Sequence, residues 1–187
     1  MRPSKKAEIV ERVTELFYRH GFQATGMDQL VAETGISKTS IYNHFPTKDA
    51  LILAALDRRD AMIRDRLFSR MQELGDGPRE QLLALFDALH EWFSEPDFKG
   101  CMFVKACSEF QDDTNPIHQR ACRHVADIVD ELTRMAREAE LPDPEHVAQQ
   151  LAVLKEGAIA MATMRGTPEV ALAAKAIAQQ IIAPSPV

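Results

Sequence analysis

Apolar side chains recur at intervals of three and four residues along most of the chain, which is the pattern of amphipathic helices. The first such segment covers residues 5–20, KKAEIVERVTELFYRH, and Gly21 follows it as a natural helix end. No segment shows the two-residue alternation of β-branched residues that marks a strand. Glycine and proline divide the remainder into further helical segments: two short ones within 25–45, then about 47–74, 78–94, 102–110, 116–140, 144–164 and 168–182. The sequence therefore predicts an all-α protein of about nine helices.

The stretch from Thr25 to Lys48, TGMDQLVAETGISKTSIYNHFPTK, has the residues expected of two short helices joined by a tight turn. Thr25 is suited to cap the first helix, with Asp28 as the acidic residue of a capping box. Gly35 is suited to the left-handed conformation that ends a helix and turns the chain. Ser37 is suited to cap the second helix.

The second short helix is expected to have one apolar and one polar side. Ile41 and Phe45 are four residues apart and are expected to point inward. Pro46 ends this helix, and Thr47 is suited to cap the next. The remaining positions carry donors and acceptors, with one fixed cation and no acid: Lys38, Thr39, Ser40, Tyr42, Asn43 and His44. Periodicity and turn chemistry alone fit an ordinary helical hairpin with a solvated polar face equally well.

The segment GISKTSIYNHFPTKDAL carries a more specific signal than this pattern. It combines the glycine turn with a Tyr-x-His-Phe ending at Tyr42, His44 and Phe45, and Lys48 follows. In these features it resembles the tetracycline-repressor (TetR) family of transcriptional regulators. The resemblance covers about the first third of the chain and favours a DNA-binding helix-turn-helix over a plain hairpin.

The resemblance implies a division of the chain into two domains. Residues 2–62 are expected to form the helix-turn-helix DNA-binding domain, with its motif at about 25–45 and its recognition helix at about 37–45. Residues 63–187 are expected to form an effector-binding and dimerisation domain. A long helix that begins near Lys48 would then connect the DNA to the effector.

The resemblance also implies how DNA is contacted. Recognition helices of this kind enter the major groove, and a two-fold dimer presents two of them to a palindromic operator on double-stranded DNA. The residues expected to include the base-edge readers are Lys38, Thr39, Ser40 and Asn43. Those expected to contact phosphate are Thr25, Tyr42, His44 and Lys48.

In this family the last two helices usually form a four-helix bundle with their copies in a second subunit. Both segments carry apolar stripes that suit a self-complementary interface. The expected homodimer interface consists of Val147, Leu151, Leu154 and Ala158 on one helix and Val170, Ala174, Ile177 and Ile181 on the other. The alternative is that both stripes only close the core of the monomer.

The middle helices hold a cluster of aromatic residues and methionines where the family usually has an effector cavity. The expected pocket lining is Met62, Phe86, Leu89, Trp92, Phe93, Met102, Phe103, Cys107 and Phe110. The alternative is that these residues form part of the ordinary hydrophobic core and line no cavity. Polar groups that would converge on a small-molecule effector are His90, Lys105, Glu109 and Arg123.

The charge distribution separates the two halves of the chain. The 187 residues carry a net charge of −6, made up of +1 over residues 1–55 and −7 over the rest. Acid is thus concentrated away from the expected DNA face. A net charge of +1 is nevertheless low for a DNA-binding domain, so the affinity for DNA would depend on local geometry and on dimerisation.

Neither a signal peptide nor an apolar run long enough to span a bilayer is present in the sequence. We therefore expect no membrane partner. Three cysteines at irregular spacing do not form a disulfide framework, which favours a reducing cytoplasm. The sequence lacks a phosphate-binding glycine loop, a zinc-hydrolase motif and a nucleophile elbow, so we do not expect an enzyme.

The cysteines suggest chemistry only at one position. Cys101 follows Gly100 near an expected helix start, where a lowered pKa would suit a sensor of electrophiles or oxidants. Cys107 and Cys122 are expected to be buried and inert. His118 and Cys122 form an i, i+4 pair, but a zinc or copper site would require more ligands at clearer spacing. We therefore expect neither a metal nor a cofactor.

These observations favour a ligand-responsive repressor that a small-molecule effector releases from DNA. One alternative is a thiol- or electrophile-responsive regulator of the same fold that uses Cys101. Another is a helix-turn-helix protein that acts through a partner protein. The remaining hypothesis is a helical enzyme without a recognisable motif. The identity of any effector does not follow from the sequence.

Overall fold

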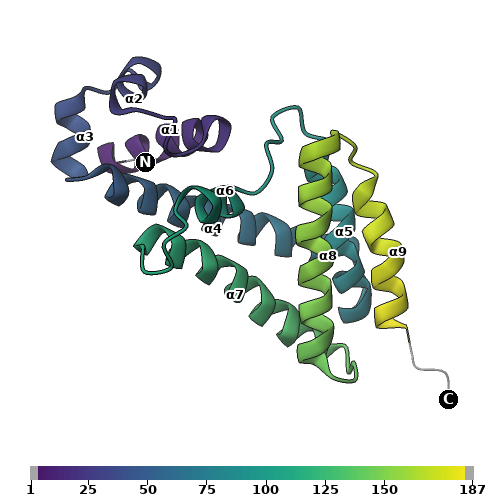
Figure 1. The fold of residues 1–187 in the computed structure, drawn as a ribbon. Coiled ribbons are helices and arrows are strands. Elements are labelled where there is room, and N and C mark those ends of the chain that lie inside the picture. Colours follow the sequence, from purple (N-terminus) through teal and green to yellow (C-terminus); the bar gives the residue numbers. More distant parts are fainter. Residues whose placement is uncertain (1–3, 184–187) are drawn as a thin grey trace. The chain divides into compact units, whose positions relative to one another are not determined.

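The computed structural model describes residues 4–183 and confirms the predicted all-α class. Over these residues the chain forms nine helices and no strands (Figure 1). The helices are α1 (Lys5–His20), α2 (Met27–Thr34), α3 (Lys38–His44), α4 (Lys48–Leu74), α5 (Pro78–Phe93), α6 (Met102–Glu109), α7 (Pro116–Glu138), α8 (Pro144–Arg165) and α9 (Val170–Ile182).

These helices form two compact units. The first unit contains the described residues up to Ile63 together with Cys101–His124, and the second contains Arg64–Gly100 and the described residues from Val125 onward. The long helices α4 and α7 therefore each contribute residues to both units. Helix α6 and the first part of α7 pack in the first unit, whereas the sequence placed them in the second domain.

The core of the first unit is built around α1. Ile9, Val13 and Phe17 lie on its inner face and are fully buried, as their spacing predicts. The helix ends at Gly21, and the next residue, Phe22, packs against Phe17 with ring centroids 5.4 Å apart. The apolar stripe of α1 thus holds the helix-turn-helix region that follows it.

Helix α6 is joined to the end of α1 through Glu109. Its carboxylate accepts hydrogen bonds from the backbone N–H groups of Phe22, at 3.0 and 3.1 Å, and of Gln23, at 2.6 Å. The ring of Phe110 also contacts that of Phe22, with centroids 6.1 Å apart in an edge-on arrangement. Because these N–H groups follow the last turn of α1, the contacts fix the chain as it turns toward α2.

A network of charged groups connects α4 to α7 within the first unit. The Asp60 carboxylate lies 2.9 Å from Arg120 Nη2 and 2.5 Å from His124 Nδ1. Arg120 also bonds Asp57 through Nε at 2.6 Å, and the His124 ring stacks on Phe103 at 3.6 Å. Asp60 and His124 are only 8% and 1% exposed, so these two residues of the network are part of the core.

The second unit is built from α5, α8 and α9, which pack side by side (Figure 1). Lys175 of α9 donates to Asp87 of α5. Arg79 at the start of α5 donates to the backbone carbonyls of Ala139 and Ile182, at 3.2 and 3.1 Å. Together these contacts connect α5 to α9 and to the loop between α7 and α8. None of the helices within residues 4–183 is long and apolar enough to cross a membrane.

Candidate nucleic-acid interface

Helices α2 and α3 are joined by a tight turn whose residues behave as predicted. Gly35 adopts the left-handed conformation, with φ 67° and ψ 11°, and closes α2 through a backbone hydrogen bond to Val31. Ile36 is 3% exposed and fills the space under the turn. The Ser37 hydroxyl accepts a hydrogen bond from the Ser40 N–H at 3.2 Å, which confirms it as the cap of α3.

Helix α3 has the predicted inner and outer sides. Ile41 is 1% exposed and Phe45 is 4% exposed, so both point into the core of the first unit. The side chains of the outer positions are exposed or, in Ser40, half-buried: Lys38, Thr39, Ser40, Tyr42, Asn43 and His44. A short helix anchored by two apolar residues therefore presents hydrogen-bonding groups to solvent. That these groups contact DNA remains a prediction.

The sequence-based assignment of Thr25 as the N-cap of α2 is wrong. The N-cap is Gly26, which supplies no side-chain hydrogen bond, and Thr25 lies outside the helix with its side chain fully buried. The Thr25 hydroxyl donates to the Gly21 carbonyl at 2.6 Å, so it closes the loop after α1. Because its hydroxyl is buried and already bonded, Thr25 is not available to contact a phosphate through its side chain.

Asp28 also differs from its predicted role. Instead of forming a capping box, its exposed carboxylate lies 3.0 Å from Lys38 Nζ at the start of α3. A hydrogen bond from the ammonium and the nearby negative charge raise the pKa of Lys38, so the side chain stays a cation at neutral pH. This ion pair connects the two helices of the motif at its exposed side.

The motif is joined to the helices on either side of it. Arg12 of α1 donates to the Thr34 carbonyl at the end of α2, at 2.6 Å. Thr47 caps α4 by accepting a hydrogen bond from the Ala50 N–H at 3.1 Å, as predicted. Lys48 is the first residue of α4 and is half-buried. The motif is therefore followed directly by the long helix α4.

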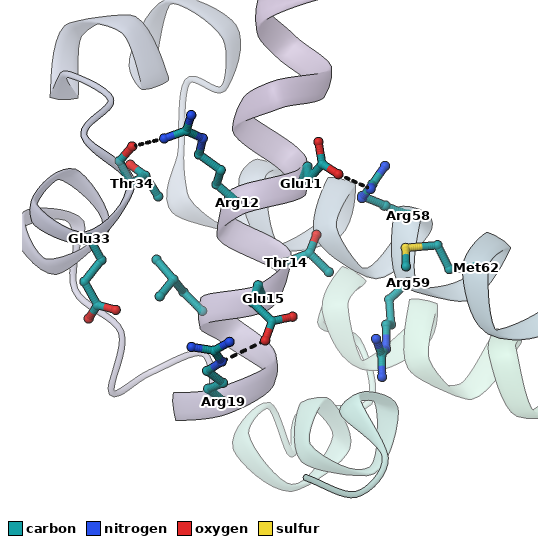
Figure 2. Close-up of a pocket in the computed structure, with 11 residues that line it drawn as sticks. Glu11, Arg12, Thr14, Glu15, Arg19, Glu33, Thr34, Arg58, Arg59 and Met62 are labelled. Carbon is teal, nitrogen blue, oxygen red and sulfur yellow. Dashed lines mark hydrogen bonds and ion pairs between the residues drawn. The ribbon is translucent and has the colours of Figure 1, made fainter. Parts of the chain in front are cut away.

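A cavity of about 540 Å³ in the first unit is lined by residues of α1, α2 and α4 (Figure 2). Figure 2 shows Arg12 reaching Thr34 and Glu11 meeting Arg58 of α4, with a nitrogen–oxygen distance of 3.0 Å for the ion pair. Met62 is the sole predicted effector residue among those that line this cavity, and it is 46% exposed. The lining is dominated by paired charges, unlike the apolar pocket expected from the sequence.

The other predicted pocket residues are mostly part of the two cores. Phe86, Leu89 and Phe93 are buried in the second unit, and Met102 and Phe103 are buried in the first. Trp92, Cys107 and Phe110 are half-buried. That these residues line an effector pocket remains a prediction.

Two of the polar groups expected at that pocket have structural partners instead. Lys105 donates to the Tyr18 carbonyl at 2.7 Å and lies over the Tyr18 ring, 5.3 Å from its centroid. Glu109 binds the backbone after α1, as described above. Both side chains therefore attach α6 to α1, because the packing of the first unit brings these helices into contact.

The predicted dimer interface needs a larger correction. Val147, Leu151, Ala158 and Ala174 are at most 6% exposed within a single chain, because α5, α8 and α9 already pack against one another. Leu154, Val170 and Ile181 are half-buried. Only Ile177, at 49% exposed, lies on an open face. The stripes chosen from the sequence mostly close the core of the monomer.

The open face of α8 and α9 carries a different apolar set. Its large members are Val153, Met161, Met164, Leu172 and Ile177, which are 71%, 41%, 80%, 44% and 49% exposed. Gly157 of α8 lies in open space and leaves room for close approach by another helix. The sequence contains an indication of this exposed face. Apolar residues occur on all sides of α8, whereas a helix with one side in solvent usually has polar residues on that side.

The cysteines are placed differently from the prediction. Cys101 is the N-cap residue of α6, as its position suggested, but it is 7% exposed. Cys122 is exposed and Cys107 is half-buried, so neither is the buried thiol that we expected. Ligand atoms of Cys107, His118 and Cys122 lie within 4.8 Å of one another. Burial and the neighbouring sulfurs, chiefly that of Cys122, raise the pKa of Cys107 to about 11.

Comparisons with known proteins agree with the helix-turn-helix geometry. Residues 9–55 match the family described as bacterial regulatory proteins, tetR family. Residues 78–178 match the tetracyclin repressor-like C-terminal domain. The two matches together span most of the chain and include both compact units.

Individual proteins are similar over nearly the whole length. The HTH-type transcriptional regulator YjdC of Escherichia coli is 23% identical over 155 residues, which are 83% of this chain and 81% of YjdC. A TetR-family regulator from Streptomyces coelicolor has a TM-score of 0.88 and 27% identity, over 97% of this chain and 90% of that one. The reduced form of E. coli NemR has the same fold, with a TM-score of 0.85 at 23% identity, over 98% of this chain and 100% of NemR. The chain belongs to the TetR family and is a helix-turn-helix transcriptional regulator.

Proposed function

We propose that this regulator is a repressor that binds a palindromic operator as a homodimer and leaves it when a small-molecule effector binds. The observation that carries the DNA-binding part is the two-sided character of α3. Two buried apolar residues, Ile41 and Phe45, anchor the helix, while its polar residues face solvent without being used in the core. Such a helix suits insertion into the major groove.

The exposed residues of α3 divide by the chemistry that they offer. Asn43 can make a bidentate contact with adenine, and the hydroxyls of Thr39 and Ser40 can donate or accept at a base edge. Lys38 is a fixed cation that can reach guanine or a phosphate. Tyr42, His44 and Lys48 suit phosphate contacts, which set the register of the protein on the duplex.

A homodimer is supported by the open apolar face of α8 and α9. Large apolar groups such as Val153, Met164 and Ile177 are exposed there, next to small residues of α8. A second copy of the same face would cover them in a two-fold symmetric contact. Two recognition helices would then bind two half-sites of one operator. The second contact compensates for the low net charge of each DNA-binding domain.

Effector release is supported by the match to the repressor-like C-terminal domain. An effector must bind better to a state in which the recognition helices are wrongly spaced, and it then shifts the population away from DNA. We place the protein in the cytoplasm, where it meets DNA, and assign it a regulatory rather than a catalytic role. The family relationship and the polar face of α3 support this assignment.

The test is a mobility-shift titration with the DNA upstream of the gene for this protein. Lys48→Ala should weaken binding to all sequences and reduce the slope of log affinity against log salt by about 1, because one phosphate contact is lost. Asn43→Ala should cost about 1–3 kcal/mol on the preferred operator and relax the preference at one position of each half-site.

Gln29→Ala, on the half-buried side of α2 and paired with Glu33, serves as the matched control and should leave both quantities unchanged. Equal binding by wild type and Asn43→Ala would contradict the assignment of α3 as the recognition helix, and an unchanged salt slope in Lys48→Ala would contradict the phosphate contact. Repeating the titration with metabolite extracts tests release, and an operator complex that no extract loosens would contradict the effector part.

A further inference from the structure

Three potential metal ligands from two helices converge in the first unit. His118 and Cys122 are four residues apart on α7, so they share one face of that helix. Cys107 comes from α6, and the packing of α6 on α7 brings its sulfur to the same place. The three ligand atoms lie within 4.8 Å of one another, although the sequence spacing of the three residues matches no common zinc motif.

The imidazole of His118 is held by a hydrogen bond to the backbone. Its Nδ1 lies 2.8 Å from the Phe110 carbonyl oxygen, which is an acceptor only, so Nδ1 carries the proton and donates it. The other nitrogen, Nε2, is left with a free lone pair. Metal-binding histidines characteristically donate their second nitrogen to a carbonyl or carboxylate in this manner.

The donor set and its exposure select the class of cation. Two sulfurs and one imidazole nitrogen suit Zn²⁺ and other thiophilic d¹⁰ cations, with bonds of about 2.3 Å to sulfur and about 2.0 Å to nitrogen. Tetrahedral bonds of these lengths place ligand atoms roughly 3.5–3.8 Å apart, so the present cluster needs only a small contraction. Cys122 is exposed, which gives a cation a route to the site from solvent.

We propose that Cys107, His118 and Cys122 bind Zn²⁺ or a similar thiophilic cation, and that this binding regulates the affinity for DNA. Three protein ligands leave the fourth position of a tetrahedral cation open to water or to a small ligand. Each cysteine loses its thiol proton to solvent as its metal–sulfur bond forms, and no electron is transferred. The regulatory part rests on the proposed DNA-binding function.

The contacts of this cluster lead to the helix-turn-helix. The carbonyl that orients His118 belongs to Phe110, whose ring packs on Phe22. Glu109 holds the backbone of Phe22 and Gln23 between α1 and α2. A cation that draws Cys107 toward α7 therefore acts on the segment that fixes the end of α1. DNA and the cation must then influence each other's affinity by the same factor.

The binding part is tested on reduced protein without DNA and without oxygen. Co²⁺ is used as a spectroscopic substitute for Zn²⁺, and Zn²⁺ affinity is measured by competition with a coloured chelator. Wild type should bind one equivalent of Co²⁺ with a thiolate charge-transfer absorption band. Cys107→Ser and Cys122→Ser should each weaken that band, because one of the two thiolate ligands is lost, and should bind Zn²⁺ at least about tenfold more weakly.

His118→Asn separates coordination from packing. The asparagine amide keeps a donor for the Phe110 carbonyl but removes the Nε2 ligand, so Zn²⁺ affinity should fall although the fold, followed by circular dichroism, is retained. Cys101→Ala is the matched control for thiol number and should bind like wild type. A cation that binds wild type and all four variants equally would overturn the site, as would a Cys107–Cys122 disulfide that forms while the reduced protein binds no metal.

The regulatory part is tested by measuring operator affinity with and without Zn²⁺. Wild type should change its operator affinity by about fivefold or more, and His118→Asn should not respond. A bound cation without an effect on the operator would overturn the regulation and leave the binding site intact. If the protein binds no DNA at all, the proposed function fails, but the titration of the free protein still decides the metal site.

Discussion

At the scale of single residues, the buried Asp60 carboxylate of α4 bonds two residues of α7, Arg120 and His124. Burial by itself would raise the pKa of Asp60, but hydrogen bonds from His124 and Arg120 and their charges outweigh burial and hold that pKa below its ordinary value of 3.8. A folded-state pKa below the unfolded one stabilises the protein at higher pH. The contribution is therefore complete above about pH 3.8 and is lost as the pH falls below it.

Asp60→Asn should lower the free energy of unfolding by about 2–3 kcal/mol at pH 7, because the buried His124 and the half-buried Arg120 lose their anionic partner. Urea unfolding followed by circular dichroism measures this difference. The difference between wild type and variant should be the same at pH 7 and pH 5 and should shrink as the pH falls below about 4.

Asp57→Asn is the control for this prediction, because Asp57 bonds the same arginine from a side chain that is 67% exposed. Its cost should not exceed about 0.5 kcal/mol. Equal losses in the two variants would show that burial of Asp60 does not determine the strength of this network.

At the scale of elements, the end of α1 is defined by one glycine and one carboxylate. Gly21 has φ 85° and ψ 173°, a conformation open to glycine and costly for other residues. A Cβ atom there would lie 2.7 Å from Glu109 Oε1. Glycine therefore serves two purposes, since it permits the backbone turn and the close approach of α6.

Gly21→Ala should destabilise the protein by about 2–3 kcal/mol, from backbone strain and from displacement of the Glu109 carboxylate. Gly35→Ala, where φ is 67° and no atom lies within 4 Å of the added Cβ, should cost only about 1 kcal/mol. Thermal unfolding of both variants measures the difference. An equal loss of stability would mean that the contact with Glu109 adds nothing to the strain at Gly21.

At the scale of the whole molecule, the second unit carries more apolar surface than one chain covers. The inner sides of α8 and α9 close the core through residues such as Leu151 and Ala174, while Val153, Met164 and Ile177 remain exposed. Several large apolar side chains exposed on two adjacent helices favour an interaction surface. We propose that a second copy of the chain covers these side chains.

Val153→Glu combined with Ile177→Glu should weaken self-association at least about hundredfold, because each charge would be buried without a partner in the dimer. Sedimentation equilibrium measures the change, and operator binding should weaken with it. Val104→Glu alters a comparably exposed valine on α6 and should leave the dimer intact. A double variant that stays dimeric would assign the interface to another surface.

The sequence by itself determined the features that depend on short-range periodicity and turn chemistry. The all-α class, the left-handed turn at Gly35, the cap at Ser37 and the burial of Ile41 and Phe45 all follow from residues within one or two helical turns of each other. The family resemblance rests on the same local segment. Caps, turns and the spacing of apolar residues depend on neighbours in the sequence, so they can be predicted without knowing which helix packs against the segment.

The tertiary structure alone decided which groups from distant segments meet. Thr25 is buried because its hydroxyl bonds the end of α1, and the stripe containing Leu151 is internal because α5 and α9 cover it. Cys107 reaches His118 and Cys122 through the packing of α6 on α7. An apolar stripe in the sequence indicates that one face of a helix is covered, but it does not indicate which helix covers it. In the same way, two metal ligands on one helix do not indicate which residue of another helix supplies the third.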